Sequence, residues 1–194
     1  MNNHIALVLA AGFSIRYGRD KRLAGAHKPL LLQTLDLVCQ NFKTVYLVHR
    51  HQDDALLMAI KGKQLSLIPA PEDCIGLGTS LATGIRGILH TLSSKDINSV
   101  SIFLADMPYI NGETIKMVLQ ESTNDNIVRP MFQNQAGHPV CFGSDFLAQL
   151  RLLSGDLGAA KIIKANAAKL RLIEVNDDGT VTDIDKPDDW KTNS

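Results

Sequence analysis

The sequence lacks several features by which many functions are first recognised. Only three of its 194 residues are cysteine, and Cys39, Cys74 and Cys141 have neither the spacing of a zinc motif nor that of a disulfide framework. No run approaches the ~20 apolar residues of a membrane span. The N-terminal stretch has neither the basic segment nor the apolar length of a signal peptide. The formal net charge is zero, which argues against a nucleic-acid-binding face. These absences predict a cytoplasmic protein without nucleic acid or membrane as partner.

The composition is that of an ordinary globular protein. Hydrophobic residues make up 45% of the chain and charged residues 21%. There is no internal repeat, low-complexity tract or long linker. We therefore expect residues 1–194 to form a single domain with a substantial core.

Apolar strands alternate with helical patterns along the chain. We expect strands at 5–10, 44–49, 65–69, 100–105, 126–129, 139–142, 170–175 and 181–184. Helices are expected at 29–41, 53–61, from Thr79 or Ser80 to 92, at 112–122, 144–153 and 156–165, and after Pro187. This alternation predicts an α/β fold, a three-layer Rossmann-like sandwich with a mostly parallel central sheet. Ligands of such sheets bind beyond the carboxyl ends of the strands.

The loop after the first strand is rich in glycine and in cations. It contains Gly12, Gly18 and Gly25, and between and after them Arg16, Arg19, Lys21, Arg22 and Lys28. Glycines let backbone N–H groups approach a polyphosphate, and cations match its charge. The loop matches neither G-x-x-x-x-G-K-[ST] nor G-x-G-x-x-G. A polyphosphate site and a solvated basic loop therefore both stay open.

Three aspartates are candidates for a metal site. Asp106 directly follows an apolar strand, a position where hard divalent cations bound to phosphates are commonly held. Alternatively, it caps the turn at 108–110. Asp183 and Asp185 point to the same side of an expected extended strand. They belong either to a metal site or to a solvated edge.

Three further positions have a structural and a functional interpretation. His138, between Gly137 and Pro139, contacts either a substrate or the loop backbone. For Asp156 the leading interpretation is the N-cap of the helix that follows it. The segment 76–80 (GLGTS) precedes a helix, and its glycines allow the close approach of an anion or a ribose.

Seven segments together form a more specific pattern than any one of them. They are LAAGFSIRYGRDK (9–21), KPLL (28–31), GLGTSLATGI (76–85), LADMP (104–108), GHPVCF (137–142), GDLGA (155–159) and DIDKPDD (183–189). In this order they resemble the nucleotidyltransferases of the nucleotide-diphospho-sugar transferase (GT-A) type. Among these the chain resembles the MobA/MocA group, which attaches a nucleotide to molybdopterin. The GHPV and GDLGA segments and the closing segment are similar to the cytidylyltransferase branch. Ala11 is similar to it as well, because that branch has LAAG where the guanylyltransferase branch tends to have LAGG.

The resemblance implies roles for particular residues. It implies that the base and the α-phosphate contact Leu9, Ala10, Ala11 and Gly12. Ser80 would lie beside the base or the ribose. Arg16 and Lys21 would hold the triphosphate and stabilise the leaving pyrophosphate, and Asp106 would bind Mg²⁺ or Mn²⁺. His138 and Asp185 would lie near the reacting phosphate, with Asp185 as a second metal contact.

The implied activity is the Mg²⁺-dependent transfer of CMP from CTP to molybdopterin, with release of pyrophosphate. A molybdenum hydroxylase or its maturation factor would be the protein partner. Three alternatives stay open: a GTP-using guanylyltransferase, an NTP transferase for a sugar phosphate or other small phosphate, and a non-catalytic nucleotide-binding accessory protein. The chain departs from the family pattern at Tyr17 (usually Met), Ala70 (often Asn) and Lys186 (usually Thr). These departures concern base choice and acceptor more than fold.

Overall fold

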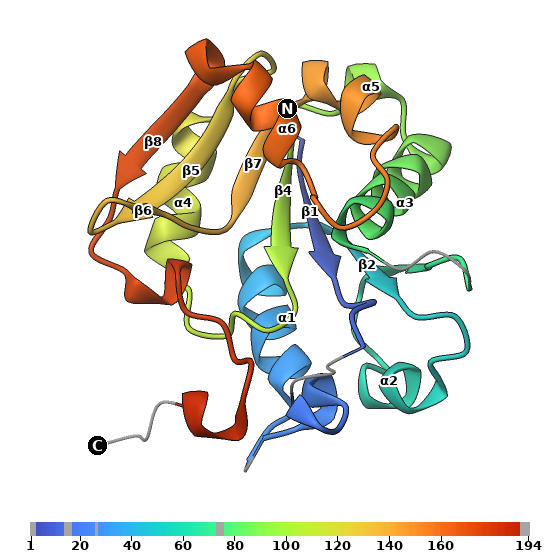
Figure 1. Cartoon of the computed structure of the whole chain (residues 1–194). Helices are drawn as coiled ribbons and strands as arrows, with labels where there is room; N and C mark the ends of the chain where they lie inside the picture. Colours follow the sequence, from blue (N-terminus) through green and yellow to red (C-terminus); the bar gives the residue numbers. More distant parts are fainter. Residues whose placement is uncertain (1–2, 14–16, 26, 73–75, 191–194) are drawn as a thin grey trace.

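The computed structural model describes residues 3–13, 17–25, 27–72 and 76–190. These residues build an eight-stranded sheet in the order β3-β2-β1-β4-β7-β5-β6, with β8 paired to β5 (Figure 1). The strands are β1 (His4–Leu9), β2 (Thr44–His49), β3 (Ser66–Pro69), β4 (Ser99–Leu104), β5 (Ile127–Phe132), β6 (Gln135–Ala136), β7 (Val140–Gly143) and β8 (Leu170–Glu174). From β3 to β4 all neighbours are parallel, whereas β7 runs antiparallel to β4 and β5. The predicted mostly parallel α/β fold is confirmed.

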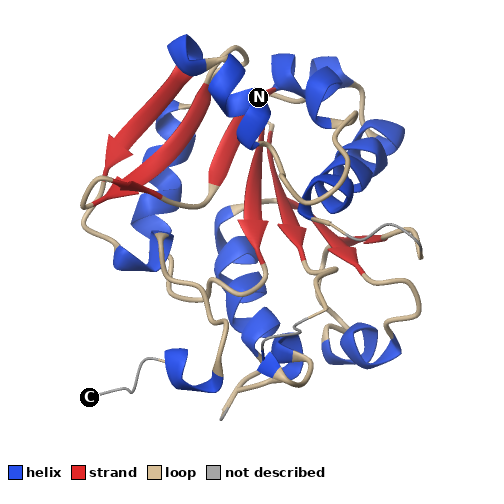
Figure 2. Cartoon of the chain, viewed as in Figure 1, coloured by secondary structure: helices blue, strands red, loops and turns tan. Residues whose placement is uncertain are grey.

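Helices cover both faces of the sheet (Figure 2). One face packs on α1 (Leu30–Asn41), α2 (Asp54–Ala59) and α4 (Gly112–Glu121), and the other on α3 (Leu77–Thr91), α5 (Leu147–Leu150) and α6 (Ala160–Ala165). Successive side chains of a strand point to opposite faces. In β1, Ile5 and Leu7 therefore join the core under α3, while Ala6 and Val8 join the core under α1. This division produces the three predicted layers.

Helix α3 lies unusually close to the sheet because it presents glycine to it. A Cβ atom added at Gly84 would lie 2.6 Å from Cδ2 of Leu7 and 2.9 Å from Cγ2 of Val48. The short separation brings the first turn of α3 beside the carboxyl end of β1. The helix thereby contributes Leu77 and Ser80 to the cavity described below.

The segment 133–138, predicted as a loop, contains a hairpin strand. Gln133 and Asn134 take positive φ values of 46° and 66°, and β6 then pairs antiparallel with β5. Two central residues with positive φ match the twist of the flanking strands. The prediction missed the turn because neither residue is glycine.

The predicted strand at 181–184 is wrong. This stretch follows a 3₁₀ turn at Asp178–Thr180 and lies outside the sheet. Ile184 is nevertheless fixed, because its N–H donates to the carbonyl of Asp106 at 3.0 Å and its side chain is fully buried. This backbone bond and the buried side chain, together with a hydrogen bond from Lys21 Nζ to the carbonyl of Ile184, help to hold the segment in the absence of a strand ladder.

The predicted helix caps are also wrong. α3 begins before Thr79, after Gly76, and has no side-chain cap. α6 begins only at Ala160, so Asp156 does not cap it.

Two predicted helices are shorter in the structure. The helix predicted at 144–153 is reduced to a 3₁₀ turn, Ser144–Phe146, and the short α5. After Pro187 the described chain forms only the 3₁₀ turn Pro187–Asp189. Within the described ranges no helix has the length and apolar character needed to cross a membrane.

Candidate active site

A cavity of about 700 Å³ lies where the four parallel strands β1 to β4 end. It is lined by residues that directly follow these strands, among them Ala10, Arg50, Ala70 and Ala105. All five predicted nucleotide-binding residues line it as well: Leu9, Ala10, Ala11, Gly12 and Ser80. We refer to it as the first cavity. Its position agrees with the rule that open α/β sheets bind ligands beyond the carboxyl ends of their strands.

Three carboxylates meet at the edge of the first cavity. One oxygen each of Asp106, Asp183 and Asp185 lies within 4.8 Å of the others. Asp106 follows β4, whereas Asp183 and Asp185 flank the fully buried Ile184. Because Ile184 points into the core, its two neighbours are left to face the cluster. The structure thus brings together the three aspartates predicted from sequence.

The carboxylate cluster fits a hard divalent cation. The Oδ1 atom of Asp106 is buried and has no hydrogen-bond partner among the described residues. Burial, and next the charges of Asp106 and Asp185, raise the pKa of Asp183. An orphaned oxygen and mutual repulsion both indicate missing positive charge. Carboxylate oxygens are the ligands that Mg²⁺ and Mn²⁺ prefer.

Lys21 is in direct contact with this cluster. Its Nζ lies 2.7 Å from Oδ2 of Asp106 and 2.8 Å from Oδ1 of Asp185, and it donates to the carbonyl of Ile184 at 2.9 Å. Burial by itself lowers the pKa of Lys21, but Asp106 and Asp185 outweigh it, so the pKa is raised. The ammonium therefore stays charged and neutralises part of the cluster. Arg16, the other predicted triphosphate contact, lies outside the described residues.

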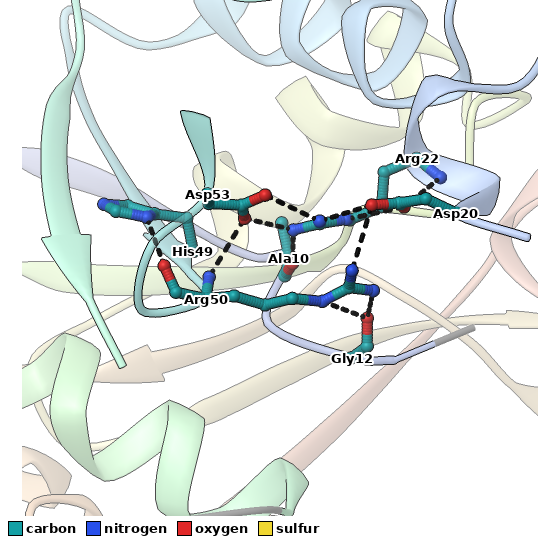
Figure 3. Close-up of polar contacts among 7 residues, drawn as sticks. All are labelled: Ala10, Gly12, Asp20, Arg22, His49, Arg50 and Asp53. Carbon is teal, nitrogen blue, oxygen red and sulfur yellow. Dashed lines mark hydrogen bonds and ion pairs between the residues drawn. The ribbon is translucent and has the colours of Figure 1, made fainter. Parts of the chain in front are cut away.

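Arg22 anchors the first loop, a role that the sequence did not reveal (Figure 3). Its side chain is only 3% exposed, and all five of its N–H groups donate. They reach both carboxylate oxygens of Asp20 at 2.6–2.9 Å, both of Asp53 at 2.6–2.9 Å, and the carbonyl of Ala10 at 2.6 Å. Arg22 has no donor left for a phosphate. Its expected contribution to polyphosphate binding is therefore wrong, and it fixes the loop instead.

Arg50 holds the same loop from the other side. It follows β2, donates from Nη1 to Asp20 at 3.0 Å and from Nε to the carbonyl of Gly12 at 3.1 Å, and lies over the Phe13 ring at 5.1 Å. The position of Arg50 at a strand end was a usable signal in the sequence. Two other cations of the loop have different partners: Lys28 pairs with Asp36, and Arg19 lies 5.9 Å from the Tyr17 ring centre.

The two glycine motifs of the sequence form one wall of the first cavity. The carbonyl of Gly155 accepts from the N–H groups of Gly78 at 2.8 Å and Thr79 at 3.3 Å, and the N–H of Gly155 donates to Oγ1 of Thr79 at 3.0 Å. A Cβ at Gly76, where φ is +132°, would lie 2.5 Å from the Gly155 carbonyl oxygen. The close approach places Asp156 on the first cavity, where its carboxylate can accept hydrogen bonds from a ligand.

His138 does not line the first cavity but a second one of about 330 Å³ beside it. The two cavities share Leu9, Leu77 and Leu104. Burial, and next the charge of Arg129, lower the pKa of His138 to about 4, while the charge of Asp106 acts in the opposite direction. The imidazole is therefore neutral at physiological pH. The charges of Arg129 and Asp106 therefore both affect the imidazole.

Comparison with known proteins identifies the family of the chain. The chain belongs to the family of MobA-like NTP transferase domains, whose model matches residues 6–170. Fold and family are those of a nucleotidyltransferase, an enzyme that transfers a nucleotidyl group from a nucleoside triphosphate. Among curated proteins none matches the sequence significantly.

Several solved structures share the fold. A homologue of Mycobacterium tuberculosis Rv0371c from Mycobacterium sp. strain JC1 is 23% identical, with a TM-score of 0.80 over 96% of this chain and 92% of its own. A nucleotidyl transferase from Methanothermobacter, Mth528, is 18% identical, with a TM-score of 0.80 over 97% and 94%. Rv0371c of M. tuberculosis in complex with manganese is 21% identical, with a TM-score of 0.71 over 90% and 88%.

Proposed function

We propose that the protein is a molybdenum cofactor cytidylyltransferase, which transfers CMP from CTP to molybdopterin with Mg²⁺ or Mn²⁺ and releases pyrophosphate. The observation that carries the proposal is the contact of Lys21 with the carboxylate cluster at the edge of the first cavity. An NTP-binding cavity, a cation site and a lysine at their junction are the parts that nucleotidyl transfer needs. Ala11 and the GHPV and GDLGA segments support CTP and molybdopterin through their resemblance to the cytidylyltransferase branch.

The first cavity suits a nucleoside triphosphate. Its volume of about 700 Å³ lies in the usual range of small-molecule sites. Ala11, Ala70 and Pro71 offer apolar contact to a base. Ser80 and Asp156 offer hydrogen-bond acceptors to ribose hydroxyls or to an exocyclic amino group. Since Ala70 replaces the frequent asparagine of the family, base selection falls to the remaining groups, Ala11 foremost.

Asp106, Asp183 and Asp185 would hold the divalent cation, which when bound neutralises phosphate charge. The manganese complex of Rv0371c supports a cation of this class. Lys21, which contacts two of these carboxylates, is placed where its ammonium would reach the phosphates. There it stabilises the charge that develops on the leaving pyrophosphate.

The reaction needs no nucleophile from the protein. An oxygen of the acceptor phosphate attacks the α-phosphorus of CTP and forms the new P–O bond. The bond from the α-phosphorus to the bridging oxygen breaks, and pyrophosphate leaves with its electron pair. Because the attacking phosphate is already anionic, no proton has to be removed. Positioning and charge neutralisation, which Arg22 and Lys21 serve, then provide most of the catalysis.

Incubation of the purified protein with each NTP, Mg²⁺ and molybdopterin tests the proposal. We expect pyrophosphate release with CTP foremost, and an equal amount of cytidylylated molybdopterin by mass spectrometry. Asp106→Asn should abolish turnover, whereas Asp145→Asn, at an exposed position, should not.

The other possible outcomes separate the alternatives. Preference for GTP would indicate a guanylyltransferase. Activity with sugar phosphates alone would change the acceptor. Binding of CTP without release of pyrophosphate in any combination would refute an enzymatic role and favour an accessory protein.

A further inference from the structure

The second cavity is built for a small ligand of its own. It lies between the sheet and α6, has a volume of about 330 Å³, and adjoins the first cavity through Leu9, Leu77 and Leu104. Most of its lining side chains are apolar. Leu77 and Leu157 on its lining are 42% and 63% exposed, which is unusual for large apolar side chains. A ligand with an uncharged body would cover them.

Arg129 places an unbalanced positive charge in this cavity. Its Nε donates to the carbonyl of Gly137 at 3.1 Å and its Nη2 to that of Ala136 at 3.0 Å. Among the described residues, Arg129 has no ion-pair partner, and its Nη1 donates no hydrogen bond. Burial lowers its pKa, and no carboxylate offsets this effect. A neutral side chain could also donate to the two carbonyls, so these hydrogen bonds do not account for the positive charge of Arg129. A bound anion would balance that charge.

The location of Arg129 relates this anion to the reaction centre. Arg129 and His138 both line the second cavity, and the charges of Arg129 and Asp106 both act on His138. His138 is neutral and can donate or accept a hydrogen bond without opposing an anion. An anion at Arg129 would lie in the cavity that adjoins the first cavity through Leu9, Leu77 and Leu104. A group bound there is a neighbour of the ligand in the first cavity, which is the position that an acceptor needs.

We propose that the second cavity is the acceptor subsite and that Arg129 binds the phosphate monoester of the acceptor, whose uncharged body packs on Leu77 and Leu157. The inference rests on the proposed function in that the first cavity holds the NTP. Arg129 then aligns the phosphate oxygen that forms the bond to the α-phosphorus as pyrophosphate departs. Lys164, exposed on the rim of the cavity, adds positive charge where the acceptor enters.

Two variants test the subsite from opposite sides. Arg129→Gln removes the charge but keeps a donor for the carbonyls. Ala160→Trp fills the cavity from α6, at an exposed position, and leaves residue 129 an arginine. Arg86→Gln is the matched control, because Arg86 is an exposed arginine that lines neither cavity. We expect both test variants to raise the KM for molybdopterin at least about tenfold. Arg129→Gln does so because one charge-assisted contact is lost, and Ala160→Trp because the side chain occupies the space of the acceptor. The KM for CTP should stay unchanged.

A binding measurement separates this inference from the proposed function. Phenyl phosphate, a phosphate monoester with an uncharged ring, is titrated into protein saturated with a non-hydrolysable CTP analogue and Mg²⁺. We expect saturable binding at millimolar concentration, weakened about tenfold in Arg129→Gln and Ala160→Trp but not in Arg86→Gln. If this holds while molybdopterin is no substrate, the subsite stands and the proposed acceptor is wrong. Absence of binding, or equal binding by all variants, would overturn the subsite.

Discussion

Replacing Lys21 by methionine should have opposite effects on metal binding and on catalysis. The ammonium is held by Asp106 and Asp185 at 2.7 and 2.8 Å, and its side chain is only 13% exposed. Charge-assisted hydrogen bonds of this kind contribute about 1.5–3 kcal/mol each, and the partial exposure of Asp106 and Asp185, at 21% and 32%, reduces their sum through solvent screening. Without them, the repelling carboxylates face one another in the metal-free protein. We expect the free energy of unfolding in EDTA to fall by about 2 kcal/mol.

The same change should strengthen binding of a divalent cation. In the wild type the cation has to displace an ammonium from two of its three carboxylates. In Lys21→Met this displacement is absent, and about 2 kcal/mol corresponds to a more than tenfold lower Kd for Mn²⁺. Turnover should nevertheless fall at saturating Mn²⁺, since no ammonium remains to stabilise the leaving pyrophosphate. Improved metal binding with impaired kcat is a combination that general damage to the fold would not produce.

Urea unfolding in EDTA and calorimetric titration with Mn²⁺ measure the two effects. Lys28→Met is the matched control, because Lys28 belongs to the same loop, pairs with Asp36 and lines neither cavity. It should leave Mn²⁺ affinity and kcat unchanged. An unaltered Mn²⁺ affinity in Lys21→Met would show that Lys21 and the cation do not compete, and would refute the reasoning.

Three further predictions concern other parts of the site. Arg22→Gln should lower the free energy of unfolding by about 3–5 kcal/mol in urea, since it leaves Asp20 and Asp53 buried or half-buried without their partner; Arg22→Lys, which lacks the five-donor fork, should not restore it. NMR titration of His138 should give a midpoint at about 4 in the folded protein, against 6.5 in the unfolded chain. Because the unfolded chain binds the proton more tightly, the free energy of unfolding should rise with pH between these values by up to about 3 kcal/mol, and His138→Gln should remove that rise. A midpoint near 6.5 would contradict the burial of His138. Ala11→Gly should lower the preference for CTP over GTP in steady-state competition, whereas an unaltered ratio would place base selection at other residues.

The strands and the residues that follow them were predictable from sequence. β1, β2 and β4 are apolar along their length because they are covered on both faces, and this burial is visible in the residue types. Asp106 was found because it directly follows such a strand. The strand-end rule also indicated Arg50. Short elements such as β6 and the 3₁₀ turns were missed, since one or two residues give no periodicity to read.

The roles of the loop cations were not predictable, because they depend on partners far along the chain. Arg22 is neutralised by Asp53, and nothing within the loop distinguishes it from a phosphate-binding arginine. The same holds for Asp156, which has the residue type and position of a helix cap. It turns to the first cavity because Gly155 bonds to Gly78 and Thr79 on another helix. Local pattern identifies the residue types of a site, whereas tertiary contacts assign their tasks.

The contact between Lys21 and Asp185 joins positions 164 residues apart, whereas that between Arg22 and Asp53 spans only 31. During synthesis on the ribosome, the anchor of the first loop is therefore complete early, while the counter-ions of Lys21 are still to be translated. The loop can take its shape around Arg22 long before the segment with Asp183 and Asp185 emerges. The order of translation thus makes the residues that shape the first loop available before Asp183 and Asp185, the last two carboxylates of the cation site.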